Sequence, residues 1–207
     1  MTTVRTVLIC FIACFLLPTA AHSEPAETPT AVVRATLDAV FRILEDQTLK
    51  QPPQAKQRRH LLEQVIAERF DYEEMSKRTL AVHWKPLSPP ERQEFVALFK
   101  TFLSDRYASK IEGYAGERVV YLSERTADGY AEVRTRLVSD KLDVPMDYRL
   151  TNKGGKWFAY DVIVDGVSLV MNYRSQFTAI IADASYQELV RRLRERTKED
   201  LAKPTTR

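Results

Sequence analysis

The sequence predicts an α+β protein in which a layer of helices packs on a curved antiparallel sheet and encloses an apolar cavity. Before residue 113 and after residue 168, apolar residues recur at three- and four-residue steps, as in amphipathic helices. Between residues 118 and 164 they alternate with polar residues, as in strands with one covered face. Since helices both precede and follow the strands, they are available to cover the sheet.

These patterns set the expected extent of each layer. We expect about five to seven helices over residues 30–112 and 168–198, and about four strands over residues 118–164. This arrangement is NTF2-like or cystatin-like. Residues 24–207 would form one domain, because a chain of this length can bury a substantial apolar core.

The helix starts carry capping signals. Residues 88–91 (Ser-Pro-Pro-Glu) place a serine cap before two prolines, with a glutamate three residues on, and predict a long helix. Residues 71–74 and 185–188 have the same capping-box spacing and predict two further helices.

The long helix has an unusually aromatic face. Phe95, Phe99 and Phe102 recur at helical spacing along it. Such a stripe is either ordinary core or the wall of an apolar cavity, and the sequence favours neither interpretation.

Hairpin turns separate the strands. Asp128-Gly129 and residues 152–155 (Asn-Lys-Gly-Gly) have the composition of tight turns. The outward positions of two strands are charged, so that face meets water or ion-pair partners. These positions are Glu132, Arg134, Arg136, Asp147 and Arg149.

The stretch 161–177 changes from a strand pattern to a helix pattern within two residues of Gly166. Before Gly166 both faces are apolar, as in a strand covered on both sides. After it, Leu169, Val170 and Tyr173 begin one apolar helix face behind a Ser168 cap. Glycine accommodates the backbone angles of so sharp an exit.

This stretch also resembles a known family. Residues 161–162, 165–170 (Asp-Gly-Val-Ser-Leu-Val) and 172–177 (Asn-Tyr-Arg-Ser-Gln-Phe) are similar to the signature of the MlaC, or toluene-tolerance, family of periplasmic phospholipid-binding proteins. The family usually has glutamate where this chain has Asp165. The resemblance continues through residues 70–72, Trp84 and residues 95–107.

The resemblance implies a carrier of diacyl phospholipid between the outer and inner membranes, which maintains the lipid asymmetry of the outer membrane. Its implied partners are an outer-membrane lipoprotein complex and an inner-membrane ABC transporter complex. We expect a monomer whose lipid-binding wall is drawn from the aromatic helix, the inward strand face and the Gly166 junction. The predicted wall residues are Phe95, Phe99, Phe102, Val133, Met146, Tyr148, Val162, Val164, Val167, Leu169, Val170 and Tyr173.

Residues 1–23 are typical of a cleaved secretory signal. Arg5 is the only charge, residues 7–17 are apolar, and residues 21–23 (Ala-His-Ser) suit cleavage before Glu24. The apolar stretch is shorter than the roughly 20 residues that span a bilayer, which disfavours an uncleaved anchor. A lipoprotein anchored through Cys14 is the other alternative. We therefore expect a periplasmic protein.

Composition and motifs exclude several function classes. The formal net charge of +3, lowered by one with the signal, is too small for a nucleic-acid footprint. Both cysteines, Cys10 and Cys14, lie in the signal, and His60 and His83 lack metal-ligand spacing. We therefore expect no metal, and no cofactor apart from phospholipid as cargo.

Two other functions remain open beside the carrier. Asp161 and Asp165, with Tyr148 or Tyr160 nearby, would suit an NTF2-like isomerase acting on an apolar small molecule. Ordinary turn chemistry and an ion pair explain these carboxylates more simply, so we expect no enzyme activity. A structural envelope adaptor without a ligand is the second alternative.

Overall fold

The computed structural model describes residues 27–202, with side chains to residue 196. The predicted signal peptide, with both cysteines, lies outside the described residues. The chain forms four helices, then five strands, then two helices. They are α1 (Pro29–Glu45), α2 (Ala55–Arg69), α3 (Tyr72–Leu80), α4 (Pro89–Glu112), β1 (Arg118–Ala127), β2 (Tyr130–Val138), β3 (Asp143–Lys153), β4 (Lys156–Val164), β5 (Val167–Ser168), α5 (Leu169–Asp183) and α6 (Tyr186–Ala202).

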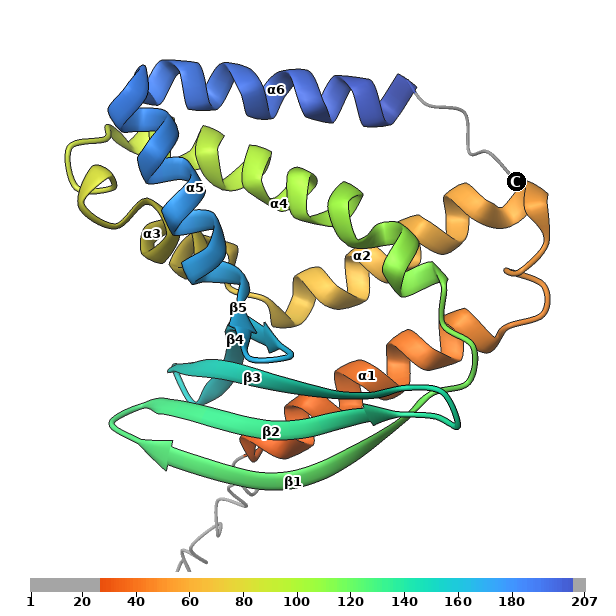
Figure 1. The fold of residues 1–207 in the computed structure, drawn as a ribbon. Helices are drawn as coiled ribbons and strands as arrows, with labels where there is room; N and C mark the ends of the chain where they lie inside the picture. The colour runs from red at the N-terminus through yellow and green to blue at the C-terminus, as the bar shows by residue number, and fades with distance from the viewer. Residues whose placement is uncertain (1–26, 203–207) are drawn as a thin grey trace, which may run out of the picture.

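The helices and the sheet form separate layers (Figure 1). α1 runs along the sheet, and α2 and α4 lie on the side of α1 away from the sheet. α6 packs on α4 and is the helix furthest from the sheet. α5 leads from the short β5 up to α6 and connects the layers. The prediction of helices on an antiparallel sheet is confirmed.

The sheet is a meander in which each strand pairs with the next in sequence, in the order β1 to β5. Two-residue turns join three of the pairs, and both residues of each turn have positive φ, as in a type I′ hairpin. The turns are Asp128-Gly129, Gly154-Gly155 and Asp165-Gly166. β5 adds a short fifth strand to the expected four, because the Asp165-Gly166 turn folds the chain back for two residue pairs before α5 begins.

The predicted helix caps are confirmed. Ser88 and Glu91 form a reciprocal capping box at the start of α4. The Asp71 carboxylate accepts a hydrogen bond from the backbone N–H of Glu74 (3.1 Å) at the start of α3. Ser168 accepts one from the N–H of Met171 (3.0 Å), so α5 begins directly after the turn.

The helical layer has an aromatic core formed by α3, α4, α5 and α6. Phe95 and Phe99 of α4 are completely buried and contact Phe177 of α5 edge to face, at ring-centroid distances of 6.0 and 5.7 Å. Tyr173 stands edge to face to Phe99 at 5.7 Å. We refer to this set, with its buried neighbours, as the aromatic cluster.

Two other cores involve α1. Its first half packs on the inner face of the sheet, where Val133 is completely buried and Leu150 nearly so. Its second half packs on α2 through Val40, Leu44 and Leu62. The other face of the sheet carries ion pairs, as predicted, including Glu132 with Arg134 (2.9 Å).

Candidate functional site

A cavity of about 780 Å³ lies between the sheet and helices α1, α2 and α4. This volume falls within the range typical of pockets for small apolar ligands, roughly 300–1,000 Å³. Its surface is mainly aliphatic. The helices contribute chiefly Val33, Leu37, Val40, Phe41, Leu44, Ile66, Leu103 and Ile111. The sheet contributes chiefly Val119, Leu137, Val144, Met146, Tyr148, Leu150, Val162 and Val164.

Six of the twelve predicted wall residues line this cavity. Five come from the sheet and one from the first residue of α5: Met146, Tyr148, Val162, Val164, Val167 and Leu169. The period-two alternation groups the four residues of β3 and β4 among them, because side chains on one face of a strand share one environment. Their contact with lipid stays a prediction.

The other six predicted residues do not line the cavity. Phe95, Phe99, Phe102, Val170 and Tyr173 belong to the aromatic cluster. Val133 is buried between α1 and the sheet. The aromatic stripe of α4 faces α5 and α6. Of the two interpretations of these phenylalanines, ordinary core is therefore the one that matches their position.

Sequence reasoning missed the part of the wall that comes from α1. The apolar face of α1, from Val33 to Leu44, was visible at helical spacing. The predicted wall does not include it, because a helix face that lines a cavity has the same pattern as one that is fully packed. α4 reaches the cavity through Leu103, Tyr107 and Ile111, on a different side from its phenylalanines.

The buried phenols at the cavity stay neutral. Burial raises the pKa of Tyr72 to about 12, with a further contribution from Glu63. Burial also raises the pKa of Tyr148, whose hydroxyl donates a hydrogen bond to Met146 Sδ (3.0 Å). Glu63 accepts a hydrogen bond from Ser104 (2.6 Å). The hydroxyls of Tyr72 and Tyr148 therefore add no negative charge to the cavity wall.

Asp161 has a structural position rather than a place in the cavity wall. It is 2% exposed and accepts hydrogen bonds from Ser168 Oγ (2.6 Å) and from the backbone N–H of Val170 (3.0 Å). Arg149 Nη1 lies 3.5 Å from the same carboxylate. Asp165 occupies the exposed turn. Neither carboxylate is among the residues that line the cavity.

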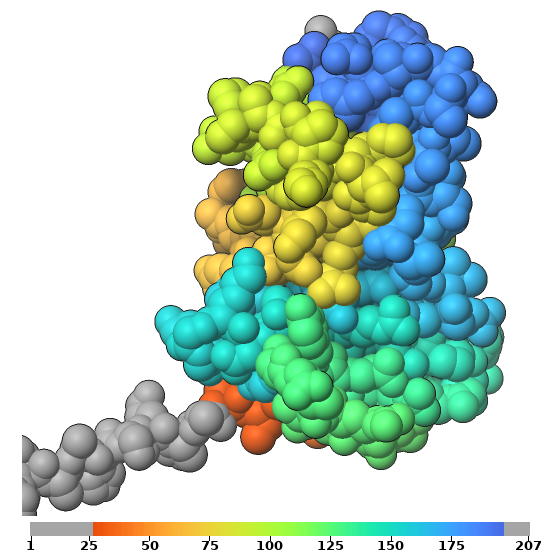
Figure 2. All heavy atoms as spheres, turned by 90° about the vertical axis from the view of Figure 1, so that its left-hand side faces the viewer, coloured from red at the N-terminus to blue at the C-terminus, as the bar shows by residue number. Residues whose placement is uncertain are grey.

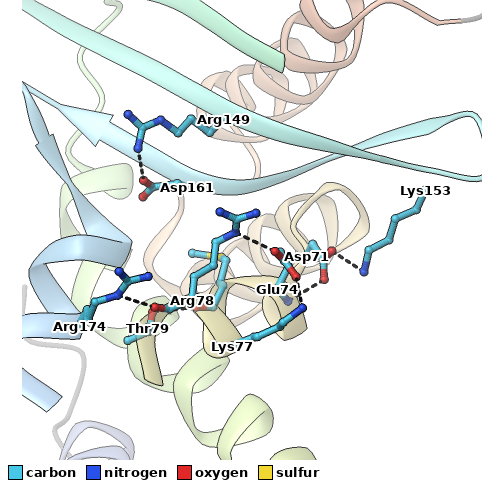
Figure 3. A network of polar contacts seen from close by, with 10 residues as sticks. Asp71, Glu74, Lys77, Arg78, Thr79, Arg149, Lys153, Asp161 and Arg174 are labelled. Carbon is cyan, nitrogen blue, oxygen red and sulfur yellow. Dashed lines mark hydrogen bonds and ion pairs between the residues drawn. The ribbon is translucent and has the colours of Figure 1, made fainter. Parts of the chain in front are cut away.

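A second polar group ties α3 to the sheet (Figure 3). Asp71 forms an ion pair with Lys153 (2.5 Å), and its backbone N–H donates to the carbonyl of Ala159 (2.8 Å). The contact brings α3 against the turn of the β3–β4 hairpin, and Figure 2 shows these two segments side by side. Arg174 of α5 donates to the carbonyl of Arg78 at the other end of α3 (2.7 Å).

The described residues contain neither a membrane-spanning helix nor a group of metal ligands. No helix in residues 27–202 combines the length and apolar character needed to cross a bilayer. Among the residues that the structure describes, no three His, Cys, Asp or Glu side chains gather where they could hold a metal ion.

A mainly aliphatic cavity of this size, walled by a sheet and three helices, defines a protein that encloses an apolar ligand. Comparison with known proteins agrees with that class. The family model described as MlaC protein matches residues 34–195. The chain therefore belongs to the MlaC family.

Individual relatives support this membership. The chain is 19% identical to the intermembrane phospholipid transport system binding protein MlaC of Haemophilus influenzae, over 92% of this chain and 91% of that protein. It is 28% identical to the toluene tolerance protein ttg2D of Pseudomonas putida, over 82% of this chain and 79% of that protein. A phospholipid-binding protein of Ralstonia solanacearum, solved in complex with a phospholipid, has the same fold, with a TM-score of 0.73 and 26% identity. That match covers 85% of this chain and 98% of the other.

Proposed function

We propose that this chain is a periplasmic carrier that binds a diacyl phospholipid, with its acyl chains in the cavity, and moves it between the outer and inner membranes. The observation that carries the proposal is the aliphatic cavity of about 780 Å³ in a chain of the MlaC family. The phospholipid held by the Ralstonia solanacearum relative supports the same ligand class.

The energetics of lipid transfer explain why a cavity is needed. Each methylene exposed to water costs about 0.8 kcal/mol, so roughly thirty methylenes cost on the order of 20 kcal/mol. An aliphatic cavity removes most of this cost, and because both bilayer and cavity are apolar, transfer between them is close to neutral. The carrier therefore works without a reaction of its own, and the direction of transfer comes from its partners.

The partners and the location belong to the same proposal. A protein named as part of an intermembrane phospholipid transport system is among the relatives. The proposed partners are an outer-membrane lipoprotein complex and an inner-membrane ABC transporter complex, which a monomeric carrier meets in turn. The secretory pattern of residues 1–23 supports a periplasmic location.

Native mass spectrometry of the purified mature protein tests the proposal. A carrier should arrive with phospholipid in stoichiometric amount, chemically intact after extraction. A ligand-free adaptor would purify without bound lipid, and an isomerase would convert an apolar small molecule that it binds. Either of these results would refute the carrier function. N-terminal sequencing should give a start at Glu24, whereas an acylated Cys14 would overturn the periplasmic assignment.

A further inference from the structure

A small polar hollow of about 120 Å³ lies where α4, α5 and α6 meet. Its lining differs in kind from that of the large cavity. Arg106 and Lys110 of α4 and Arg196 of α6 contribute three cations, and Asn172 of α5 contributes an amide.

The hollow adjoins the aliphatic cavity. Tyr107, Lys110 and Asn172 line both of them. The hollow therefore lies next to the cavity on the side formed by α4 and α5.

Among the residues whose side chains the structure describes, no carboxylate balances the charge of the hollow. None of them lines it with a carboxylate, and none forms an ion pair with Arg106, Lys110 or Arg196. Other arginines of α6 behave differently, since Arg191 pairs with Glu188 and Glu195. Cations gathered without a counter-charge repel one another, so this hollow suits an anion.

Neutral donors complete the hollow. The hydroxyls of Tyr107 and Tyr173 lie 3.4 Å apart. Burial, followed by this hydrogen bond, raises the pKa of Tyr173, so its hydroxyl stays protonated and can donate. Guanidinium, ammonium, hydroxyl and amide groups that line one hollow match in kind the several acceptor oxygens of a phosphate group.

We propose that this hollow binds the phosphate of the phospholipid whose acyl chains occupy the cavity. The assignment rests on the proposed carrier function and adds a headgroup site to it. A free phosphate ion offers the same chemistry, so the experiment must separate the two sources.

The test compares two short-chain lipids that share the same acyl chains, one with a phosphoglycerol headgroup and one without it. Isothermal titration calorimetry on protein freed of bound lipid measures the affinity for dioctanoyl phosphatidylglycerol and for dioctanoylglycerol. We expect Arg106→Gln with Arg196→Gln, two residues that line the hollow but not the cavity, to weaken phosphatidylglycerol binding about tenfold in the double variant, since each partly exposed charge contact is worth a few-fold. Affinity for dioctanoylglycerol should not change.

Arg125→Gln is the control. Arg125 is exposed on β1 and lines neither the cavity nor the hollow, so its loss should leave both affinities unchanged. A phosphatidylglycerol effect for Arg125→Gln, or equal losses for both lipids in the double variant, would overturn the headgroup site.

Two further outcomes separate the sources and the proposals. Inorganic phosphate that binds in the hollow with the cavity already filled by dioctanoylglycerol would assign the hollow to a free anion. Wild-type protein that binds neither lipid would refute the carrier function itself. Wild-type protein that binds both lipids, with affinities that do not change in the Arg106→Gln, Arg196→Gln double variant, would refute the headgroup site alone.

Discussion

Val167→Glu should empty the cavity without unfolding the protein. Val167 follows Gly166 in β5 and lines the cavity, yet its side chain is 55% exposed. A glutamate there is hydrated while the cavity is empty and is covered by hydrocarbon when an acyl chain occupies it. The substitution therefore acts on the loaded state far more than on folding.

The structure sets the size of the effect. Full burial of a valine side chain is worth about 1.5–3 kcal/mol, and roughly half of Val167 remains for a ligand to cover, so the lost contact is about 1 kcal/mol. Desolvating an unpaired carboxylate adds a further penalty, which partial exposure and a raised pKa reduce. We expect a total of about 2–4 kcal/mol, or roughly thirty- to several-hundredfold weaker loading. An exposed substitution of this kind should change the free energy of unfolding by less than about 1 kcal/mol.

Lipid extraction and circular dichroism melts of the purified variant measure the two effects separately. Leu122→Glu is the matched control, because Leu122 is 56% exposed on β1 and does not line the cavity. It should keep wild-type loading. A well-folded Val167→Glu protein that still carries wild-type amounts of phospholipid would refute a role for Val167 in the wall, and a severe drop in its melting temperature would show that Val167 is core.

Phe99→Leu should lower the free energy of unfolding by about 1–2 kcal/mol, because Phe99 is completely buried in the aromatic cluster. The amount of lipid per folded molecule should not change. A loss of lipid without a loss of stability would show that Phe99 lines the cavity. Asp161→Asn should lower the free energy of unfolding by about 1–3 kcal/mol by weakening two hydrogen bonds, and the bound lipid should stay chemically intact. A variant that binds normal amounts of lipid but loses a measurable catalytic turnover would favour an enzyme. The hydrogen bond to Asp71 raises the pKa of Lys153. This stabilisation is present below the ordinary lysine pKa and is lost as pH rises through the higher folded value. The free energies of unfolding of wild type and Lys153→Met, measured by urea melts, should therefore approach one another as pH rises above about 10.5. A difference in free energy that does not shrink at higher pH would contradict the linkage.

Local signals predicted most of the fold. The Ser88 capping box, the Asp128-Gly129 turn and the Gly166 junction each fix the backbone within a few residues, and all three are confirmed. β5 was not predicted, because two residues carry too little pattern to distinguish a strand from the cap of the next helix.

The cavity wall was half predictable, for a physical reason. On the sheet, Met146, Tyr148 and Val162 share one face, so the strand period selected them together. On α4 the sequence shows an apolar stripe but not which neighbour it faces. The phenylalanines point to α5 and α6, while Leu103 and Tyr107 reach the cavity. Such a choice depends on the packing of helices far apart in sequence, which a local pattern does not contain.

The distribution of large side chains explains how this fold keeps a cavity. The aromatic rings of α4 and α5 pack on one another, and all the buried members of the aromatic cluster except Met75 and Leu103 lie outside the cavity walls. The walls themselves are mainly aliphatic side chains that line the space between the layers without filling it. Asp161 and the Asp71–Lys153 pair fasten the sheet to α5 and α3 beside that space. Emptying the cavity therefore leaves most of the helical core and these polar ties intact, which is what a carrier that must release its ligand without unfolding requires.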